Sequence, residues 1–398
     1  MTEQAKVPAI RFAGFTDPWE QRKLGELTES YSGGTPAAGE SEFYGGSIPF
    51  IRSAEIAAES TELFLTEKGY ESSSARMVKP GDVLYALYGA TSGEVAVSRQ
   101  KGAINQAILA ILPRDDCDAR YITAWLRKQK GYIVTTYLQG GQGNLSGVIV
   151  KNLEVSIPSL PEQQKIGFML SHLDSLITLH QRKYDKLVIF KKSMLEKMFP
   201  KDGESVPEIR FAGFTDPWEQ RKASEVFQIV DDRGHPTLPV LSATQNQGMI
   251  YRDDSGRYIG HDESNEIGYK RVLPGDFVVH LRSFQGGFAH SQYEGITSPA
   301  YTVFRAKEPT SHSDRFWKHW FMSEHFIAGL STVTYGIRDG RSISVDEFMN
   351  TFLAFPAVEE QAAISRLFDY LDDLITLHQR KLELLQNIKK SLLDKMFA

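Results

Sequence analysis

Two loops in this sequence concentrate side chains that can form hydrogen bonds with nucleic-acid bases. One loop covers residues 140–146 (GGQGNLS) and the other covers residues 336–342 (GIRDGRS). Gln and Asn can form paired hydrogen bonds with adenine, Arg with guanine, and Ser or Thr with several base groups. The chemistry that these residue types offer is the recognition of base edges.

Other polar residues near predicted strands extend this set of candidate DNA-contacting residues. Each one, taken alone, is at least as well explained as an ordinary turn residue, so the prediction concerns the sets and not their single members. In the first half of the chain the candidates are Arg52, Tyr88, Thr91, Ser92, Asn105, Gln106, Gln142, Asn144 and Ser146. In the second half they are Arg233, His235, Gln245, Asn246, Arg282, Ser283, Gln285, Arg338 and Arg341.

The common motifs for catalysis and cofactor binding are not found in the sequence. Residues 140–147 lack the terminal Gly-Lys-Ser/Thr of a phosphate-binding loop, and there is no His-Glu-x-x-His motif, dinucleotide fingerprint or serine nucleophile elbow. The single cysteine, Cys117, is too few for an intramolecular disulfide or a multi-cysteine zinc site. One sequence alone does not decide whether two carboxylates form a catalytic site, although no pair of residues suggests one. We expect no catalytic residues, metal or cofactor in this chain.

The elements that must position these loops occur twice in the chain. Residues 10–23 (IRFAGFTDPWEQRK) return unchanged as residues 209–222, an offset of 199 (209 minus 10). Residues 173–199 return with changes as residues 371–397, an offset of 198 (371 minus 173). The inserts between these frames look unrelated. A period of about half the chain indicates tandem duplication, and two constant frames with different inserts suggest recognition of two different targets.

Each copy ends in a long predicted helix whose apolar residues recur alternately four and three positions apart. This spacing is typical of a coiled-coil seam, and two such helices in one chain most simply pack on each other. A histidine interrupts each seam, and it lacks a second metal ligand at i+3 or i+4 on the same face. About 35 helical residues rise ~50 Å, enough to span successive turns of DNA at ~34 Å. The seam residues are Leu173, Ile177, His180, Tyr184, Leu187, Leu371, Ile375, His378, Leu382 and Leu385.

Both inserts contain short strand-like runs interrupted by glycine. A Pro-Gly-Asp turn begins the matching strand in each insert, at Pro80 and Pro274. A helical stretch follows at residues 119–130 and 314–328. In the first frame, residues 17–20 (DPWE) look like the start of a short helix, with Asp17 as the N-cap, Pro18 at position N1 and Glu20 at position N3.

These patterns predict a mixed α/β (α+β) fold with two recognition domains in a tandem pseudo-repeat, joined by two long coiled-coil helices. We expect the first domain at residues 1–158 and the central helix at residues 159–200. We expect the second domain at residues 201–356 and the C-terminal helix at residues 357–398.

Composition is ordinary for a globular protein, with 41% hydrophobic and 24% charged residues among 398. No run reaches the roughly 18 consecutive apolar residues of a membrane helix, and the N-terminus has no export signal. We therefore expect a cytoplasmic protein without a membrane partner. The net charge of -5 argues weakly against unselective coating of nucleic acid.

On these residues the chain resembles the specificity (S) subunits of type I restriction-modification systems. The resemblance spans the whole chain and rests on PWEQRKLGEL at Pro18 to Leu27, IPSLPEQQKI at Ile157 to Ile166, the Pro-Gly-Asp strands, and LITLHQRK, which occurs twice. Together these motifs are specific, although each alone would be weak. The second copy has Val358-Glu359 in place of Leu160-Pro161, which leaves the geometry of its helix entry open.

The resemblance implies two α/β target-recognition domains joined by an antiparallel coiled coil. Each domain would read one half of a split, asymmetric site in double-stranded DNA, and the helices would set the gap between the halves. The chain would be non-catalytic and would bind two modification (methyltransferase) subunits, which use S-adenosylmethionine to methylate adenine. Restriction (translocase and nuclease) subunits would add reactions that need ATP and Mg²⁺.

Two other functions stay open at this point: a stand-alone coiled-coil DNA-binding regulator, and an interaction scaffold that binds no DNA. Salt-dependent, sequence-selective DNA binding would exclude the scaffold. A requirement for a modification subunit would separate the S-subunit function from the regulator.

Overall fold

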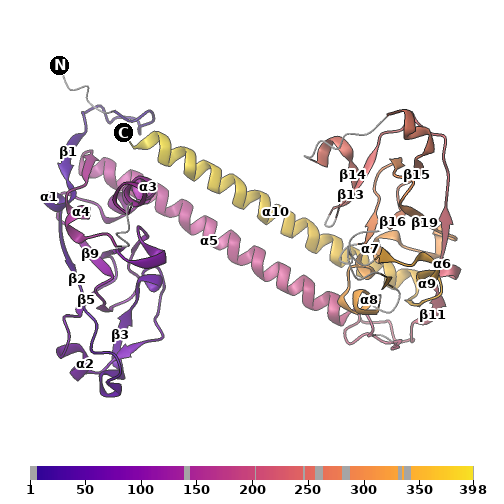
Figure 1. Ribbon diagram of the computed structural model, residues 1–398, viewed down its shortest axis with the longest axis horizontal. Helices are drawn as coiled ribbons and strands as arrows, with labels where there is room; N and C mark the ends of the chain where they lie inside the picture. The colour runs from indigo at the N-terminus through magenta and orange to yellow at the C-terminus, as the bar shows by residue number, and fades with distance from the viewer. Residues whose placement is uncertain are drawn as a thin grey trace. The chain divides into compact units, whose positions relative to one another are not determined.

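The computed structural model describes residues 7–138, 144–201, 203–244, 247–255, 263–279, 287–329, 334–335 and 342–397. The chain divides into two compact units (Figure 1). Unit 1 comprises Met1–Gln181 and Arg380–Ala398, and unit 2 comprises Arg182–Gln379. Each unit therefore contains one insert together with parts of both long helices.

In each unit, a short strand that precedes the insert pairs with a short strand that follows it. In unit 1, β1 (Glu20–Lys23) pairs antiparallel with β10 (Glu154–Ile157). In unit 2, β11 (Glu219–Lys222) pairs with β22 (Phe352–Phe355) in the same register. The helix predicted to start at residues 17–20 is therefore wrong. Backbone pairing with a strand far along the chain outweighs the local capping pattern, which is a weak signal by itself.

The two long helices begin at equivalent positions. α5 is Leu160–Lys197 and α10 is Val358–Met396, and their first residues differ by the repeat offset of 198 (358 minus 160). The sequence change in the second copy, Val358-Glu359 for Leu160-Pro161, therefore leaves the helix start in place.

A buried ion pair ties the N-terminal part of each frame to its helix. Arg11 donates from Nε and Nη2 to the two carboxylate oxygens of Glu162, at 2.9 and 2.6 Å. Arg210 makes the same pair with Glu360 at 2.8 and 2.7 Å. Both carboxylates are buried, and two parallel N–H···O bonds are the strong geometry for a guanidinium and a carboxylate. The repeated residues thus build the same joint twice.

An antiparallel four-stranded sheet, in the order β2-β9-β6-β7, lies at the centre of unit 1, and a second sheet has the order β4-β3-β8-β5. In the second sheet β3 runs parallel to β8. The bounds are β2 (Thr28–Ser32), β3 (Tyr44–Ile51), β4 (Phe64–Leu65), β5 (Arg76–Val78), β6 (Val83–Ala86), β7 (Val95–Val97), β8 (Gly102–Ile104) and β9 (Ile108–Pro113).

Unit 2 repeats the central sheet in the order β12-β19-β16-β17, although the inserts share little sequence. Besides the pair β11-β22, the other described strands of this unit form the pairs β13-β14, β15-β18 and β20-β21. The bounds are β12 (Phe227–Val230), β13 (Leu241–Thr244), β14 (Gly248–Tyr251), β15 (Lys270–Val272), β16 (Phe277–Val279), β17 (Phe288–His290), β18 (Gly295–Thr297), β19 (Thr302–Ala306), β20 (Thr334–Tyr335) and β21 (Ser342–Ile343).

One helix in unit 1 and one in unit 2 supply buried aromatic residues to the cores, and a second helix in unit 2 adds the partly buried Phe326. α3 (Ala119–Tyr137) begins after Asp118, whose carboxylate accepts two backbone N–H groups of the first turn. Unit 2 has α7 (Asp314–Trp320) and α8 (Glu324–Gly329) in the equivalent place. The remaining helices are short: α1 (Leu24–Leu27), α2 (Glu67–Glu71), α4 (Gly147–Lys151), α6 (Ala223–Val226) and α9 (Val345–Met349).

In unit 1 the first part of α5 lies against the last part of α10. Leu170 and Leu173 belong to the same apolar cluster as Leu392 and Leu393, and Asp174 pairs with Lys389. Residue numbers rise along α5 as they fall along α10, so these segments run antiparallel.

Unit 2 contains the corresponding contact between the last part of α5 and the first part of α10. Met194 packs against the cluster that contains Phe368 and Leu371, and Lys191 Nζ lies 2.5 Å from Asp372 Oδ1. These segments are also antiparallel. Across both units, all ten predicted seam residues are buried or half-buried.

The end of each long helix completes the core of a unit. Phe397 follows α10 and its ring lies 5.3 Å from the ring of Tyr121 in unit 1. Phe199 follows α5 and is buried in the core of unit 2. The backbone N–H of Ile10 donates to the carbonyl of Lys395 at 3.0 Å, so the start of the first repeated frame contacts the last turn of α10 within unit 1 (Figure 1).

Candidate nucleic-acid interface

In unit 1 the candidate DNA-contacting residues gather at one edge of the central sheet. β6 and β9 are paired so that Ala86 lies opposite Ile108. The chain leaves β6 toward Tyr88 at the same edge where it enters β9 from Gln106. Asn144 joins this edge through an isolated antiparallel bridge with Tyr88. Three separate segments of the insert therefore meet there.

The second sheet adds two residues to the same edge. β3 and β8 run parallel with Ile51 opposite Ile104, so the following residues, Arg52 and Asn105, lie next to each other in register. We name this surface the β6-β9 edge. It comprises Arg52, Tyr88, Thr91, Ser92, Asn105, Gln106, Asn144 and Ser146, which are all the described candidates of the first insert.

Several of these side chains hold the loops of the β6-β9 edge in shape. Ser92 is buried, and its hydroxyl donates to the carbonyl of Gly89 at 2.9 Å. Ser146 Oγ accepts the backbone N–H three residues later at the start of α4, and Asn105 Oδ1 accepts the backbone N–H two residues later. These three residues have a structural role at the edge, and their contact with DNA stays a prediction.

Arg52 is held in place by an acidic neighbour. Its Nη2 lies 2.6 Å from Glu55 Oε1, and its backbone N–H donates to the same carboxylate. The hydrogen bond from Arg52 lowers the pKa of Glu55 to about 2, so the carboxylate is ionised at neutral pH. The Arg52 side chain remains 49% exposed. A guanidinium carries five N–H donors, so the remaining ones can serve a base or a phosphate.

In unit 2 the equivalent edge carries Arg233 and His235. Val230 of β12 and Val279 of β16 pair with consecutive residues at the start of β19. Both strands therefore end at the same edge, as β2 and β6 do in unit 1. We name this surface the β16-β19 edge. It comprises Arg233 and His235, which follow β12 in the chain.

Both residues of the β16-β19 edge already have carboxylate partners. Arg233 Nε lies 2.7 Å from Asp231 Oδ1, and His235 Nε2 lies 2.8 Å from Asp232 Oδ1. These hydrogen bonds lower the pKa of each aspartate. Arg233 is 45% exposed and keeps unused N–H donors, as Arg52 does, whereas a phosphate contact by His235 Nε2 would require this nitrogen to exchange its partner.

The remaining candidates lie outside the described residues, and they stay predictions from the sequence: Gln142, Gln245, Asn246, Arg282, Ser283, Gln285, Arg338 and Arg341.

Thr35 is a polar residue beside the β6-β9 edge that residue type and spacing did not single out. Its hydroxyl donates to Gln106 Oε1 at 2.5 Å. The available signal was the preceding glycine pair, because a Cβ on Gly33 would lie 1.8 Å from the carbonyl oxygen of Ile104. Such a close backbone approach admits only glycine.

The cysteine of the chain is not a reactive group. Cys117 is buried, and burial raises its pKa to about 12. The thiol is therefore protonated at neutral pH, whereas a nucleophilic cysteine needs the thiolate.

Among the helices that the structure describes, none is long and apolar enough to cross a membrane.

The chain is similar to known proteins over part of its length and over nearly all of it. Residues 16–188 match the type I restriction modification DNA specificity domain. The chain is 22% identical over 398 residues to the type I restriction enzyme MjaVIII specificity subunit of Methanocaldococcus jannaschii, covering 95% of this chain and 92% of that protein. It is 25% identical over 187 residues to the EcoR124I/EcoR124II specificity subunit of Escherichia coli, covering 42% and 46% of the two chains.

A solved structure shares the fold. The crystal structure of the type I restriction-modification S subunit from M. genitalium matches with a TM-score of 0.59 and 12% identity, covering 99% of both chains. At this identity the likeness concerns the fold alone. The mixed α/β fold predicted from the sequence is confirmed.

Proposed function

The chain belongs to the specificity subunits of type I restriction-modification systems, and from this premise we propose that it reads a split, asymmetric DNA site. Each unit binds one half-site through its sheet edge. The chain contributes recognition and no catalysis, and the DNA chemistry belongs to other subunits of the complex.

The observation that carries this proposal is the pair of equivalent edges with different side chains. Both units have the same central sheet order, and both collect their polar candidates where the equivalent strands end. At the β6-β9 edge these residues are mainly amides and hydroxyls, whereas the described part of the β16-β19 edge has Arg and His. Amide and guanidinium groups select different bases. The two half-sites therefore differ in sequence.

The long helices serve as an antiparallel coiled coil that sets the gap between the half-sites. Support comes from the buried or half-buried seam residues and from the two equivalent ion pairs, Lys389 with Asp174 and Lys191 with Asp372. Each residue added to both helices would change the gap by ~1.5 Å.

The partners are two modification (methyltransferase) subunits that dock on repeated surfaces of the helices, and restriction subunits that join the same complex. Leu179 and Leu377, at equivalent positions, are 46% and 45% exposed, and Phe190 and Ile388 are 47% and 39% exposed. Each unit thus presents a similar exposed pair. Repeated surfaces suit two copies of one partner. S-adenosylmethionine, ATP and Mg²⁺ belong to those partners.

A double substitution at the β6-β9 edge tests whether each unit reads its own half-site. Replacing Gln106 and Asn144 with Ala removes two amides from unit 1, and we expect selectivity for one half-site to fall at least about tenfold, since one paired base contact is worth ~1–3 kcal/mol. The other half-site should be read as before. The measurement is DNA binding by the chain with its modification subunit, using duplexes randomised in one half-site at a time.

The matched control is Gln129→Ala, which removes an amide from α3, away from the edge, and should leave both half-sites unchanged. Equal loss of selectivity at both half-sites would contradict the modular reading of the DNA. Failure of the parent chain to prefer any sequence would contradict DNA recognition itself.

A further inference from the structure

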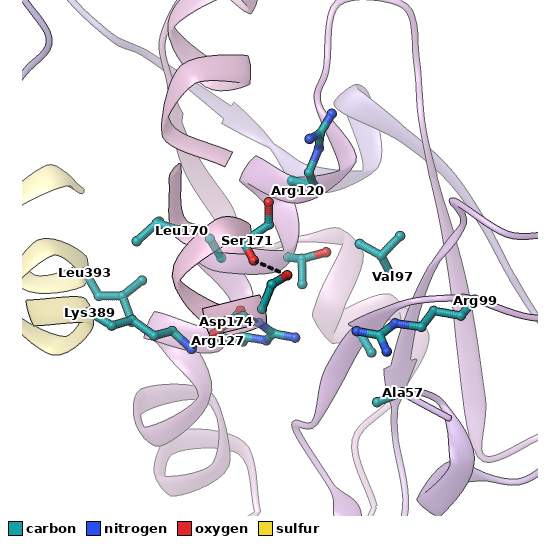
Figure 2. A pocket seen from close by; sticks show the side chains of 14 residues that line it. Ala57, Val97, Arg99, Arg120, Arg127, Leu170, Ser171, Asp174, Lys389 and Leu393 are labelled. Carbon is teal, nitrogen blue, oxygen red and sulfur yellow. Dashed lines mark hydrogen bonds and ion pairs between the residues drawn. The ribbon is translucent and has the colours of Figure 1, made fainter. Parts of the chain in front are cut away.

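A cationic cavity lies in unit 1 between β7, α3, α5 and α10 (Figure 2). Its volume is about 170 Å³. Arg127, Asp174 and Lys389 lie together on one side, and Arg99 extends toward them from the other side. The charged residues of its lining are four cations and one carboxylate: Arg99, Arg120, Arg127, Lys389 and Asp174.

The charges in this cavity do not balance. Four cations and one carboxylate give a net charge of +3 (four minus one). Glu59, outside the lining, pairs with Arg99 at 3.1 Å, which leaves a net charge of +2 (three minus one). Asp174 is shared between Arg127 and Lys389. Within the described part of the chain, the guanidinium of Arg120 lies 6.0 Å from the ring of Phe168 and has no carboxylate partner, and in Figure 2 it points away from Arg127 and Asp174.

The duplication provides an internal comparison for this site. The backbone N–H groups of Asp118 and Ser313 donate to the equivalent residues Gln163 and Gln361 of the two long helices, at 2.9 Å each. Asp118 and Ser313 are the N-caps of α3 and α7, so Arg120 and Arg315, two residues later, are equivalent. The repeat offset of 198 makes Ser171 of α5 equivalent to Asp369 of α10 (369 minus 171).

In unit 2 the protein supplies its own anion at this place. Asp369 lies 3.0 Å from Arg315, 3.7 Å from Lys318 and 3.1 Å from His319. Asp372, the equivalent of Asp174, pairs with Lys191 and Lys318. Two carboxylates thus face three Lys or Arg side chains, and a bound metal would have to displace these cations from the carboxylates. In unit 1 the second carboxylate is replaced by the hydroxyl of Ser171. By the alignment of the two N-caps, Lys318 and His319 are replaced by Thr123 and Ala124, and the cavity has Arg99 and Arg127 instead.

We propose that unit 1 binds a phosphate-sized oxyanion in this cavity, in the place that the Asp369 carboxylate occupies in unit 2. A phosphate dianion offsets the two positive charges, and guanidinium groups bind phosphate oxygens through paired N–H donors. Ser171 and Ser175 also line the cavity, and their hydroxyls donate to the carbonyls of Phe168 and Ser171 at 2.9 and 3.1 Å, so each would have to exchange this partner to donate to the anion.

The size of the cavity limits what it encloses. Its volume of about 170 Å³ exceeds the ~30 Å³ share of one water molecule several times, and is below the ~300–1,000 Å³ of sites that enclose drug-sized ligands. A phosphoryl group fits, whether free or at the end of a nucleotide whose remainder stays outside.

The oxyanion would connect the recognition part of unit 1 to both long helices, because the cavity residues come from α3, α5 and α10. Val97 and Arg99 lie at the end of β7 away from Tyr88 and Thr91, since β7 runs antiparallel to β6. The oxyanion site is therefore separate from the β6-β9 edge, and phosphate binding can be lost without loss of base selectivity.

Calorimetric titration of inorganic phosphate into the full chain, in buffer free of phosphate and sulfate, tests this proposal. We expect one site per chain, because unit 2 carries its own carboxylates. Ser171→Asp copies unit 2 and should weaken phosphate binding at least about tenfold, equivalent to ~1.4 kcal/mol. Phosphate should raise the melting temperature of the parent chain, as expected for a ligand that binds the folded state, but not that of Ser171→Asp.

A second variant and a matched control complete the experiment. Arg127→Gln should also weaken phosphate binding, whereas Arg315→Gln, at the equivalent of Arg120 in unit 2, should keep the parent affinity. A parallel titration with ATP separates the two sources of the phosphoryl group. ATP binding that is lost in Ser171→Asp supports a nucleotide, and phosphate binding alone supports the free anion. If the parent chain binds neither ligand, or if Ser171→Asp binds phosphate as tightly as the parent, the proposal is overturned.

Discussion

At the scale of single residues, the buried histidines of unit 2 give it a distinct response to acid. Burial lowers the pKa of His312 to about 4, and its Nδ1 accepts a hydrogen bond from Trp317 Nε1 at 2.8 Å. Burial also lowers the pKa of His319. Both residues lie in unit 2. The unfolded chain protonates its histidines near ~6.5, so the unfolded state gains protons first as the pH falls.

The sign of the pH effect follows from these directions. A histidine whose folded pKa lies below its unfolded value adds stability above pH ~6.5, and that stability is lost as the pH falls toward 4. We expect acidification from pH 7 to 5 to destabilise unit 2 by on the order of 2 kcal/mol through His312. Hydrogen–deuterium exchange, corrected for intrinsic rates, should show loss of protection in unit 2 before unit 1.

His312→Asn provides the control for this prediction. Asn does not titrate, and its side-chain oxygen can accept the hydrogen bond from Trp317, so the pH response of unit 2 should become flatter. The pKa values of the Glu55 and Asp369 carboxyl groups are lowered to about 2. These two groups therefore lose their contribution to the stability of the folded state only at lower pH. Parallel loss of protection in both units between pH 7 and 5 would contradict this account.

At the scale of elements, the end of α10 acts as a structural part of unit 1. Phe397 is 3% exposed, and its carbonyl accepts a hydrogen bond from Lys128 Nζ at 3.0 Å. Truncating a buried phenylalanine leaves a cavity and costs about 3–5 kcal/mol. We expect Phe397→Ala to destabilise unit 1 by this amount, measured by denaturant unfolding together with hydrogen–deuterium exchange.

Two further variants show whether this effect is local. Phe199→Ala, at the equivalent position after α5, should lower protection in unit 2 instead. Phe190→Ala removes a side chain that is 47% exposed, and it should change the free energy of unfolding by less than about 0.5 kcal/mol. Loss of protection in unit 2 on Phe397→Ala would mean that the helix end does not complete the core of unit 1.

The long and strongly periodic elements were predictable from the sequence, and the short frame strands were not. The strand-like runs after Pro80 and Pro274 are β6 and β16, and the predicted helical stretches became α3 in unit 1 and α7 with α8 in unit 2. β1 was mistaken for a helix start, because its structure depends on pairing with β10, 131 residues later (154 minus 23). Local signals carry no information on such a partner.

The candidate site shows the same division between local and non-local information. Residue type identified amides and hydroxyls that can contact bases. Their meeting at the β6-β9 edge depends on the parallel pairing of β3 with β8 and on the bridge between Tyr88 and Asn144. Neither contact leaves a periodic signal in the sequence. The internal roles of Ser92 and Ser146 became visible only with their hydrogen-bond partners.

At the scale of the whole molecule, the duplication explains both the constant and the variable parts of the chain. The residues that repeat build the joint between frame and helix, as in the pairs of Arg11 with Glu162 and Arg210 with Glu360. The inserts differ, and their sheet edges carry different polar residues. Two equivalent units with different edges are the arrangement that a split, asymmetric DNA site requires.

The most direct test of this central claim is genome-wide mapping of adenine methylation in a host that carries the cognate modification subunit, with and without this chain. We expect methylation at two short half-sites separated by a constant number of unspecified bases, present only with the chain. Unchanged methylation, despite a soluble complex of the chain with the modification subunit, would contradict the proposed function.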